Sequence, residues 1–125
     1  MTIDHPLPAA VTALRGEEAT VDQVRMAADQ AHELIRYLNY ATQAWTAPVT
    51  LRSPADTTRL IGTLHEITQH LQQTLDRAGE RITVVGPGSE QARHAARHLL
   101  SAREALRETS RHLAQAHAAA VQLPG

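Results

Sequence analysis

The stretch HEITQH, residues 65–70, comes within one residue of the zinc-hydrolase motif HExxH. That motif needs its two histidines at positions i and i+4 of a helix, so that both imidazoles reach one metal ion. His65 and His70 are five positions apart, which at about 100° per residue separates them by about 140° around a helix. Because the two side chains cannot chelate one ion from a continuous helix, the spacing excludes a zinc hydrolase of this type.

A second histidine pair does have the chelating spacing. His94 and His98 are four residues apart, with Arg93 and Arg97 beside them and Glu90 one turn earlier. A transition-metal site usually has three or four ligands and tolerates neighbouring cations poorly. We therefore expect two surface histidines and no cofactor, and we keep a His-based metal-binding bundle as an alternative.

Arginine supplies every basic side chain, since the 12 Lys and Arg residues include no Lys. Five of them recur near the C-terminus, at Arg93, Arg97, Arg103, Arg107 and Arg111. Such a row can contact a phosphate backbone, which makes a nucleic-acid-associated protein a second alternative. The net charge of −1 and the lack of a helix-turn-helix, a zinc finger or an aromatic platform favour a solvated helix face instead.

The aromatic residues gather in one short segment, at Tyr37, Tyr40 and Trp45, and the chain has no Phe. Amphipathic aromatic side chains are typical of binding hot spots, so we predict a partner interface here. The alternative is that they pack beneath the following linker against Val49 and Leu51.

Several chemistries are excluded by composition. The chain has no cysteine, which excludes disulfides, thiolate catalysis and cysteine-ligated metals. Ser53 and Ser89 have the context of helix caps, and GPGSE at 86–90 lacks the lysine and spacing of a phosphate loop. We therefore expect a protein that is not an enzyme.

Neither a membrane span nor a secretory signal is expected from the sequence. No run of about 18 apolar residues exists. The start TIDHPLP lacks the basic and apolar regions of a signal peptide, which favours a cytoplasmic location.

Three long helices are predicted to position these residues, over about 20–46, 54–84 and 89 onward. Apolar or small side chains recur in each at alternating steps of three and four, which is a heptad stripe. The stripes are Val21, Val24, Ala28, Ala31, Ile35, Leu38, Thr42 and Trp45; Leu60, Leu64, Ile67, Leu71, Thr74 and Ala78; and Ala92, Ala95, Leu99, Ala102, Leu106, Thr109, Leu113, Ala116 and Ala120.

Capping and breaking residues set the predicted boundaries. Thr20 caps the first helix, Pro48 ends it before an extended connection, and Ser53-Pro54 starts the second helix. Gly86-Pro87-Gly88 breaks the chain before a third helix that Ser89 caps. Short linkers make consecutive helices antiparallel, so we predict an all-α, up-down-up three-helix bundle over 19–125 with an extended arm at 1–18.

The stripes are rich in Ala and therefore bury little apolar area. We expect the deficit to be met by association, either in a homo-oligomer or with another helical protein. The function that follows is that of a helical interaction or accessory protein.

The segment RYLNYAT, residues 36–42, followed by the helix that begins at Pro54, resembles small helical proteins of actinobacterial genomes and mobile elements. The resemblance covers residues 35–76, about a third of the chain, and implies no known activity. A second resemblance is to the secreted WXG100 helical hairpins. Trp45-Thr46-Ala47 has the tryptophan of that motif but lacks its glycine, and no Tyr follows residue 40, so the C-terminal export signal is absent.

Overall fold

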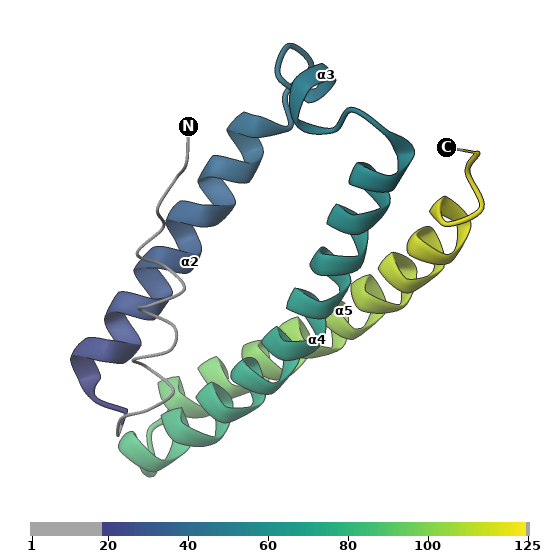
Figure 1. Cartoon of the computed structure of the whole chain (residues 1–125). Helices are drawn as coiled ribbons and strands as arrows, with labels where there is room; N and C mark the ends of the chain where they lie inside the picture. The colour runs from purple at the N-terminus through teal and green to yellow at the C-terminus, as the bar shows by residue number, and fades with distance from the viewer. Residues whose placement is uncertain (1–18, 125) are drawn as a thin grey trace. The chain divides into compact units, whose positions relative to one another are not determined.

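The computed structural model describes residues 19–124, so the arm predicted at 1–18 lies outside the described residues. Within this range all regular structure is helical (Figure 1). The helices are α2 (Val21–Ala41), α3 (Ala47–Thr50), α4 (Pro54–Val85) and α5 (Glu90–Ala120). The all-α prediction is therefore confirmed. The chain forms two compact units, Met1–Pro48 and Val49–Gly125, and the helix packing that is established is that of α4 on α5, within the second unit.

The first helix begins as predicted and ends earlier. The Thr20 hydroxyl accepts a hydrogen bond from the Gln23 backbone N–H (3.1 Å), and the Gln23 side chain accepts one from the Thr20 N–H (3.0 Å), which forms a capping box. At the other end, both the N–H and the hydroxyl of Thr42 donate to the Leu38 carbonyl, at 3.0 and 2.7 Å. The helix predicted over about 20–46 therefore ends at Ala41.

Pro48 lies inside the short helix α3, where an extended connection was predicted. Proline has no N–H, and inside a longer helix its ring would clash with the carbonyl four residues earlier, so α2 cannot run through it. In the first turn of α3 the missing N–H costs nothing. Trp45 consequently lies between the two helices and not on the stripe of α2, and it is 72% exposed.

The ends of α4 and α5 are those that the sequence predicts. The Ser53 hydroxyl accepts from the Asp56 N–H, and the Asp56 carboxylate accepts from the Ser53 N–H, both at 3.2 Å. Beyond Val85, Gly88 has the positive φ of 73° that an L side chain rarely adopts, which reverses the chain. With 32 and 31 residues, α4 and α5 are each about 48 Å long.

Helices α4 and α5 pack antiparallel along their lengths (Figure 1), and contacts from end to end define the register. Level positions are Thr58 with Ala120, Gly62 with His117, Asp76 with Arg103, Gly79 with Leu99 and Gly86 with Ala92. At one end the Thr58 hydroxyl donates to the Ala120 carbonyl (3.3 Å). At the other, a Cβ on Gly86 would lie 3.0 Å from the Ala92 Cβ, so the backbones come close there.

The rows of side chains between α4 and α5 form the seam of this hairpin. They are buried or half-buried and follow the heptad spacing. The seam includes Ile61, His65, Thr68, Gln72, Leu75, Gly79 and Ile82 on α4, and Ala92, Ala96, Leu99, Arg103, Leu106, Ser110, Leu113 and His117 on α5, and Leu60 and Leu64 at its edge are half-buried as well. Small and polar residues make up most of it, which brings the helices together without a large apolar core.

The seam differs from the predicted stripes by one position. On α4 the first two residues of the predicted row, Leu60 and Leu64, are half-buried, whereas Ile67 and Leu71 are 39% and 42% exposed. On α5 the prediction is right for the leucines and wrong where it placed Ala102, Thr109 and Ala116 in contact. The residues that follow them in the chain, Arg103, Ser110 and His117, lie in the seam instead. On α4 the hydrophobic pattern predicts contact along the row with most leucine, whereas α5 packs on the neighbouring row, which has more small and polar side chains.

Candidate interaction and metal-binding surfaces

One ion pair crosses the seam. The Arg103 Nη1 atom lies 3.2 Å from the Asp76 Oδ1 atom, and Arg103 also donates to the Glu104 Oε1 atom at 2.6 Å. Partial burial alone would lower the pKa of Arg103, but the hydrogen bond to Asp76 and the charges of Asp76 and Glu104 outweigh it, and the pKa is raised. Because its pKa is raised, Arg103 loses its proton only in strongly alkaline solution and stays charged throughout the neutral range.

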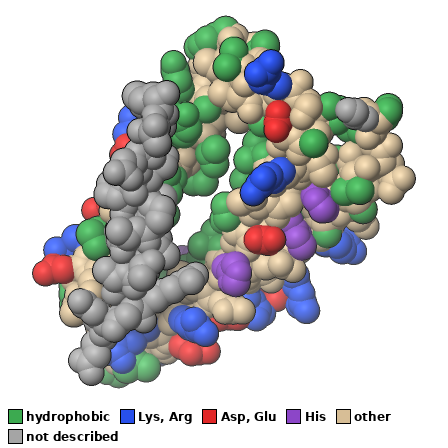
Figure 2. Space-filling view, in the orientation of Figure 1, with side chains coloured by type: hydrophobic (Ala, Val, Ile, Leu, Met, Phe, Trp, Pro, Cys, Tyr) green, Lys and Arg blue, Asp and Glu red, His purple; other side chains and the backbone are tan. Residues whose placement is uncertain are grey.

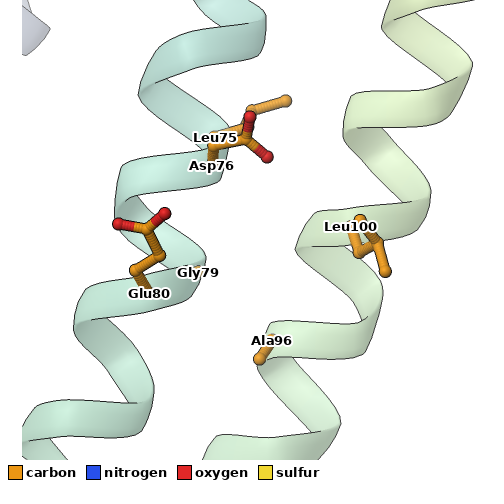
Figure 3. A pocket seen from close by; sticks show the side chains of 6 residues that line it. All are labelled: Leu75, Asp76, Gly79, Glu80, Ala96 and Leu100. Atoms are coloured by element: carbon orange, nitrogen blue, oxygen red, sulfur yellow. The ribbon is translucent and has the colours of Figure 1, made fainter.

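Two shallow grooves lie on the same side of the seam as this ion pair. One, of about 240 Å³, is lined by Leu75, Asp76, Gly79, Glu80, Ala96 and Leu100, and Figure 3 shows the carboxylates of Asp76 and Glu80 on α4 and the side chains of Ala96 and Leu100 on α5. The other is lined by Gln69, Gln72, Gln73, Asp76, Arg103 and Arg107. This polar side of the hairpin brings amides and ion pairs together, without a histidine or hydroxyl in either lining.

The five predicted arginines do not form one surface. Arg103 lies in the seam, while the other four are exposed on α5. Arg107 lies 3.9 Å from Glu104, and Arg111 donates to Glu108. A phosphate backbone would have to compete with these carboxylates, so the observed pairing is the one expected of a solvated helix face.

The three aromatic residues are all exposed. Tyr37 and Tyr40 lie on the last turns of α2, and Trp45 follows in the turn before α3. The Thr46 hydroxyl donates to the Tyr40 carbonyl (3.0 Å), which ties this turn to the end of the helix. The predicted partner interface at these residues stays a prediction.

Four residues of the predicted stripe of α4 form an aliphatic row along the edge of the seam, in which Leu60 and Leu64 are half-buried and Ile67 and Leu71 are exposed. Hydrophobic side chains follow one edge of α4 in Figure 2. A shallow groove of about 340 Å³ lies on this helix alone, lined by Thr63, Glu66, Ile67, His70, Leu71 and Thr74. The groove lies on the opposite side of α4 from Gln69 and Gln73, so the hairpin has an aliphatic side and a polar side.

The residues of HEITQH point apart, as their spacing predicts. His65 is half-buried in the seam, and His70 is exposed beside the aliphatic row. His94 and His98 do come together: their Nε2 atoms are 3.2 Å apart, and the Arg97 Nη2 atom is 3.5 Å from the His94 Nδ1 atom.

A second pair of side chains whose types can bind a metal ion is not among the sequence predictions. His112 and Glu108 are also spaced i, i+4 on α5, and the His112 Nε2 atom is 3.2 Å from the Glu108 Oε1 atom. The signal that would have found this pair is its offset of two heptads from His94 and His98. Within residues 19–124 no three histidine, cysteine or carboxylate side chains are grouped to hold a metal ion.

The part of the chain that the structure describes has no helix with both the length and the apolar character needed to span a bilayer. Comparisons with known proteins supply no further guide to function, since no family model, no curated protein and no solved structure matches the chain.

Proposed function

We propose that this protein is a non-enzymatic helical interaction protein that self-associates through helix faces. The observation that supports the proposal is the exposure of Ile67 and Leu71 on the aliphatic row of α4, where Leu60 and Leu64 are half-buried. A helix with two adjacent packing faces fits between two neighbouring helices. Of the two faces of α4, helix α5 covers only one. The second face is therefore a docking surface for an amphipathic helix.

Helix α2 has a stripe of matching length and chemistry, which includes Val24, Ala31, Ile35 and Leu38. In this proposal α2 covers part of the aliphatic row of its own hairpin, as in the up-down-up bundle that the sequence predicts. A second copy covers the rest of the row. No large side chain among residues 19–124 is fully buried. Burying the exposed half of one Leu or Ile contributes about 1 kcal/mol, so a few such side chains suffice to drive association.

The test is the molar mass of the full chain, measured by size-exclusion chromatography with light scattering over a range of concentrations, with EDTA present. We expect the mass to rise above that of the monomer with concentration. The double variant Ile67→Glu/Leu71→Glu places charge on the aliphatic row and should remain monomeric. Circular dichroism verifies that the variant keeps its helices.

Gln69 and Gln73 offer a matched control, because they lie on the polar side of the same two turns of α4. Gln69→Glu/Gln73→Glu adds the same charge and should associate like the unmodified chain. A chain that stays monomeric at every concentration contradicts self-association. If Ile67→Glu/Leu71→Glu associates normally, another face is responsible.

A further inference from the structure

The outward row of α5 has two matched pairs of metal-ligating side chains. His94 and His98 form the first pair, and Glu108 and His112 form the second. Each pair has i, i+4 spacing, and the second follows the first by two heptads, so both project from the same side of the helix. All four residues are exposed, and none belongs to the seam.

In both pairs the distance between the two candidate ligand atoms matches one edge of a zinc site. Zinc binds histidine nitrogen and carboxylate oxygen at about 2.0–2.2 Å in a tetrahedron, which places two ligand atoms about 3.3 Å apart. The Nε2 atoms of His94 and His98 are 3.2 Å apart, as are the His112 Nε2 and Glu108 Oε1 atoms. Each pair therefore spans one edge of the tetrahedron and lacks the two ligands of the opposite edge.

A two-fold rotation between two copies of the chain places each ligand pair opposite the pair that completes its tetrahedron. When two α5 helices lie antiparallel with residue 103 of each at the same level, the first pair of one copy faces the second pair of the other. Ser101 and Ala105 lie on the same row between the pairs, and their small exposed side chains allow the two helices to approach closely. The rotation produces two equivalent sites about 21 Å apart along the helix.

We infer that a zinc ion, or a similar divalent transition metal ion, joins two copies of this chain at each of these sites. His94 and His98 come from one copy, and Glu108 and His112 come from the other. Three imidazoles and one carboxylate are ligands that zinc uses in proteins, and four ligands close the tetrahedron. The surface involved is separate from the aliphatic row of α4, so this inference does not depend on the proposed self-association.

Two arginines contact the proposed ligands and oppose metal binding. The Arg97 guanidinium lies beside the His94 Nδ1 atom, which must carry a proton when Nε2 binds a metal ion, and Arg111 occupies the Glu108 carboxylate. Both are exposed and can turn away. Arg97→Gln should therefore raise the zinc affinity. Protons compete with the metal for imidazole nitrogen, so the affinity should fall as the pH is lowered.

The test uses the untagged full chain with zinc chloride as the probe, and measures zinc affinity by competition with a chromophoric chelator and molar mass by light scattering. We expect one zinc ion per chain and a mass twice that of the metal-free protein at the same concentration. Zinc bound without a change in mass would show an adventitious chelate at His94 and His98 and would overturn the inference. Comparison with the metal-free mass separates this result from the association through α4.

Complementation between two variants gives the sharper test. His94→Ala/His98→Ala and Glu108→Ala/His112→Ala should each lose about 100-fold or more in zinc affinity, because removing a ligand costs at least as much as removing an outer-shell partner. An equimolar mixture rebuilds one complete site per mixed dimer. It should regain the original affinity with one zinc ion per two chains.

A mixture that binds zinc no better than its separate components would refute the shared site. The control is His32→Ala/His70→Ala, which removes two exposed histidines outside the row. This variant should bind zinc and double its mass like the unmodified chain. Equal losses in the control and in the ligand variants would also overturn the inference, since they would mean that histidines bind zinc regardless of position.

Discussion

Two glycines of α4 face α5 and leave different amounts of room. A Cβ on Gly79 would lie 3.8 Å from the Leu99 Cβ, which is an ordinary contact. The helical backbone there suits any residue, since the only positive φ in the described range is that of Gly88. Gly79→Ala should therefore raise the free energy of unfolding by about 0.5–1 kcal/mol, the difference in helix propensity. Urea denaturation measures it.

Gly62 provides the contrast for Gly79. A Cβ there would lie 3.1 Å from two atoms of the His117 ring, so the ring must shift to admit it. Gly62→Ala should stabilise less than Gly79→Ala, or destabilise, and the full gain should return in a His117→Ala background. Equal gains at both glycines in the unmodified background would show that the His117 ring moves freely and makes no specific contact with α4.

For single residues, the sequence predicts which side chains of one helix lie close together more reliably than it predicts their contacts with another helix. It predicts that His94 and His98 come together and that His65 and His70 do not, because i, i+4 geometry is a property of one helix. It does not predict that Arg103 leaves the surface row, because this depends on Asp76, which lies 27 residues away on the other helix. Ion pairs between helices need the register, and the register is not local information.

At the scale of a helix, the start of α4 is a capping box with proline at its first position. Ser53→Ala removes the acceptor of the Asp56 N–H and should lower the free energy of unfolding by about 1 kcal/mol. Ser53→Asp keeps a capping oxygen and serves as the control, with a loss of a few tenths of a kcal/mol at most. Thermal and urea unfolding measure both variants. The same loss in both would mean that the hydroxyl cap does not stabilise α4.

Helix boundaries follow from the sequence because caps and breakers act locally. Ser53-Pro54 and Gly86-Pro87-Gly88 place both ends of α4 almost to the residue. The early end of α2 was missed because Thr42 caps it with its own hydroxyl, a role that its place on the apolar stripe conceals. The seam was misplaced by one position because leucine content identifies the most apolar row. In the hairpin, Gly79, Ala92 and Ala96 allow close approach and therefore decide which rows meet.

At the scale of the whole molecule, the part of the chain that the structure describes is notable for its lack of a large core. The buried residues in the described range are Ala41, Ala92 and Ser110, which are all small. A hairpin of two helices about 48 Å long with so little buried apolar surface gains most of its further stability from whatever covers the aliphatic row. In the proposed assembly stability and association are therefore linked.

This linkage has a measurable consequence for the full chain with EDTA present. Mass action makes the midpoint of thermal unfolding depend on protein concentration when folding and association are coupled. A tenfold increase adds about 1.4 kcal/mol per dimer, which should raise the midpoint by about 3–6 °C for a pair of chains of this size. Ile67→Glu/Leu71→Glu should unfold at a lower temperature that does not change with concentration. Gln69→Glu/Gln73→Glu should keep the concentration dependence, because its charges lie on the polar side of the hairpin. A midpoint of the unmodified chain that is independent of concentration would mean that one copy covers its own aliphatic row completely, with α2 as the helix that does so.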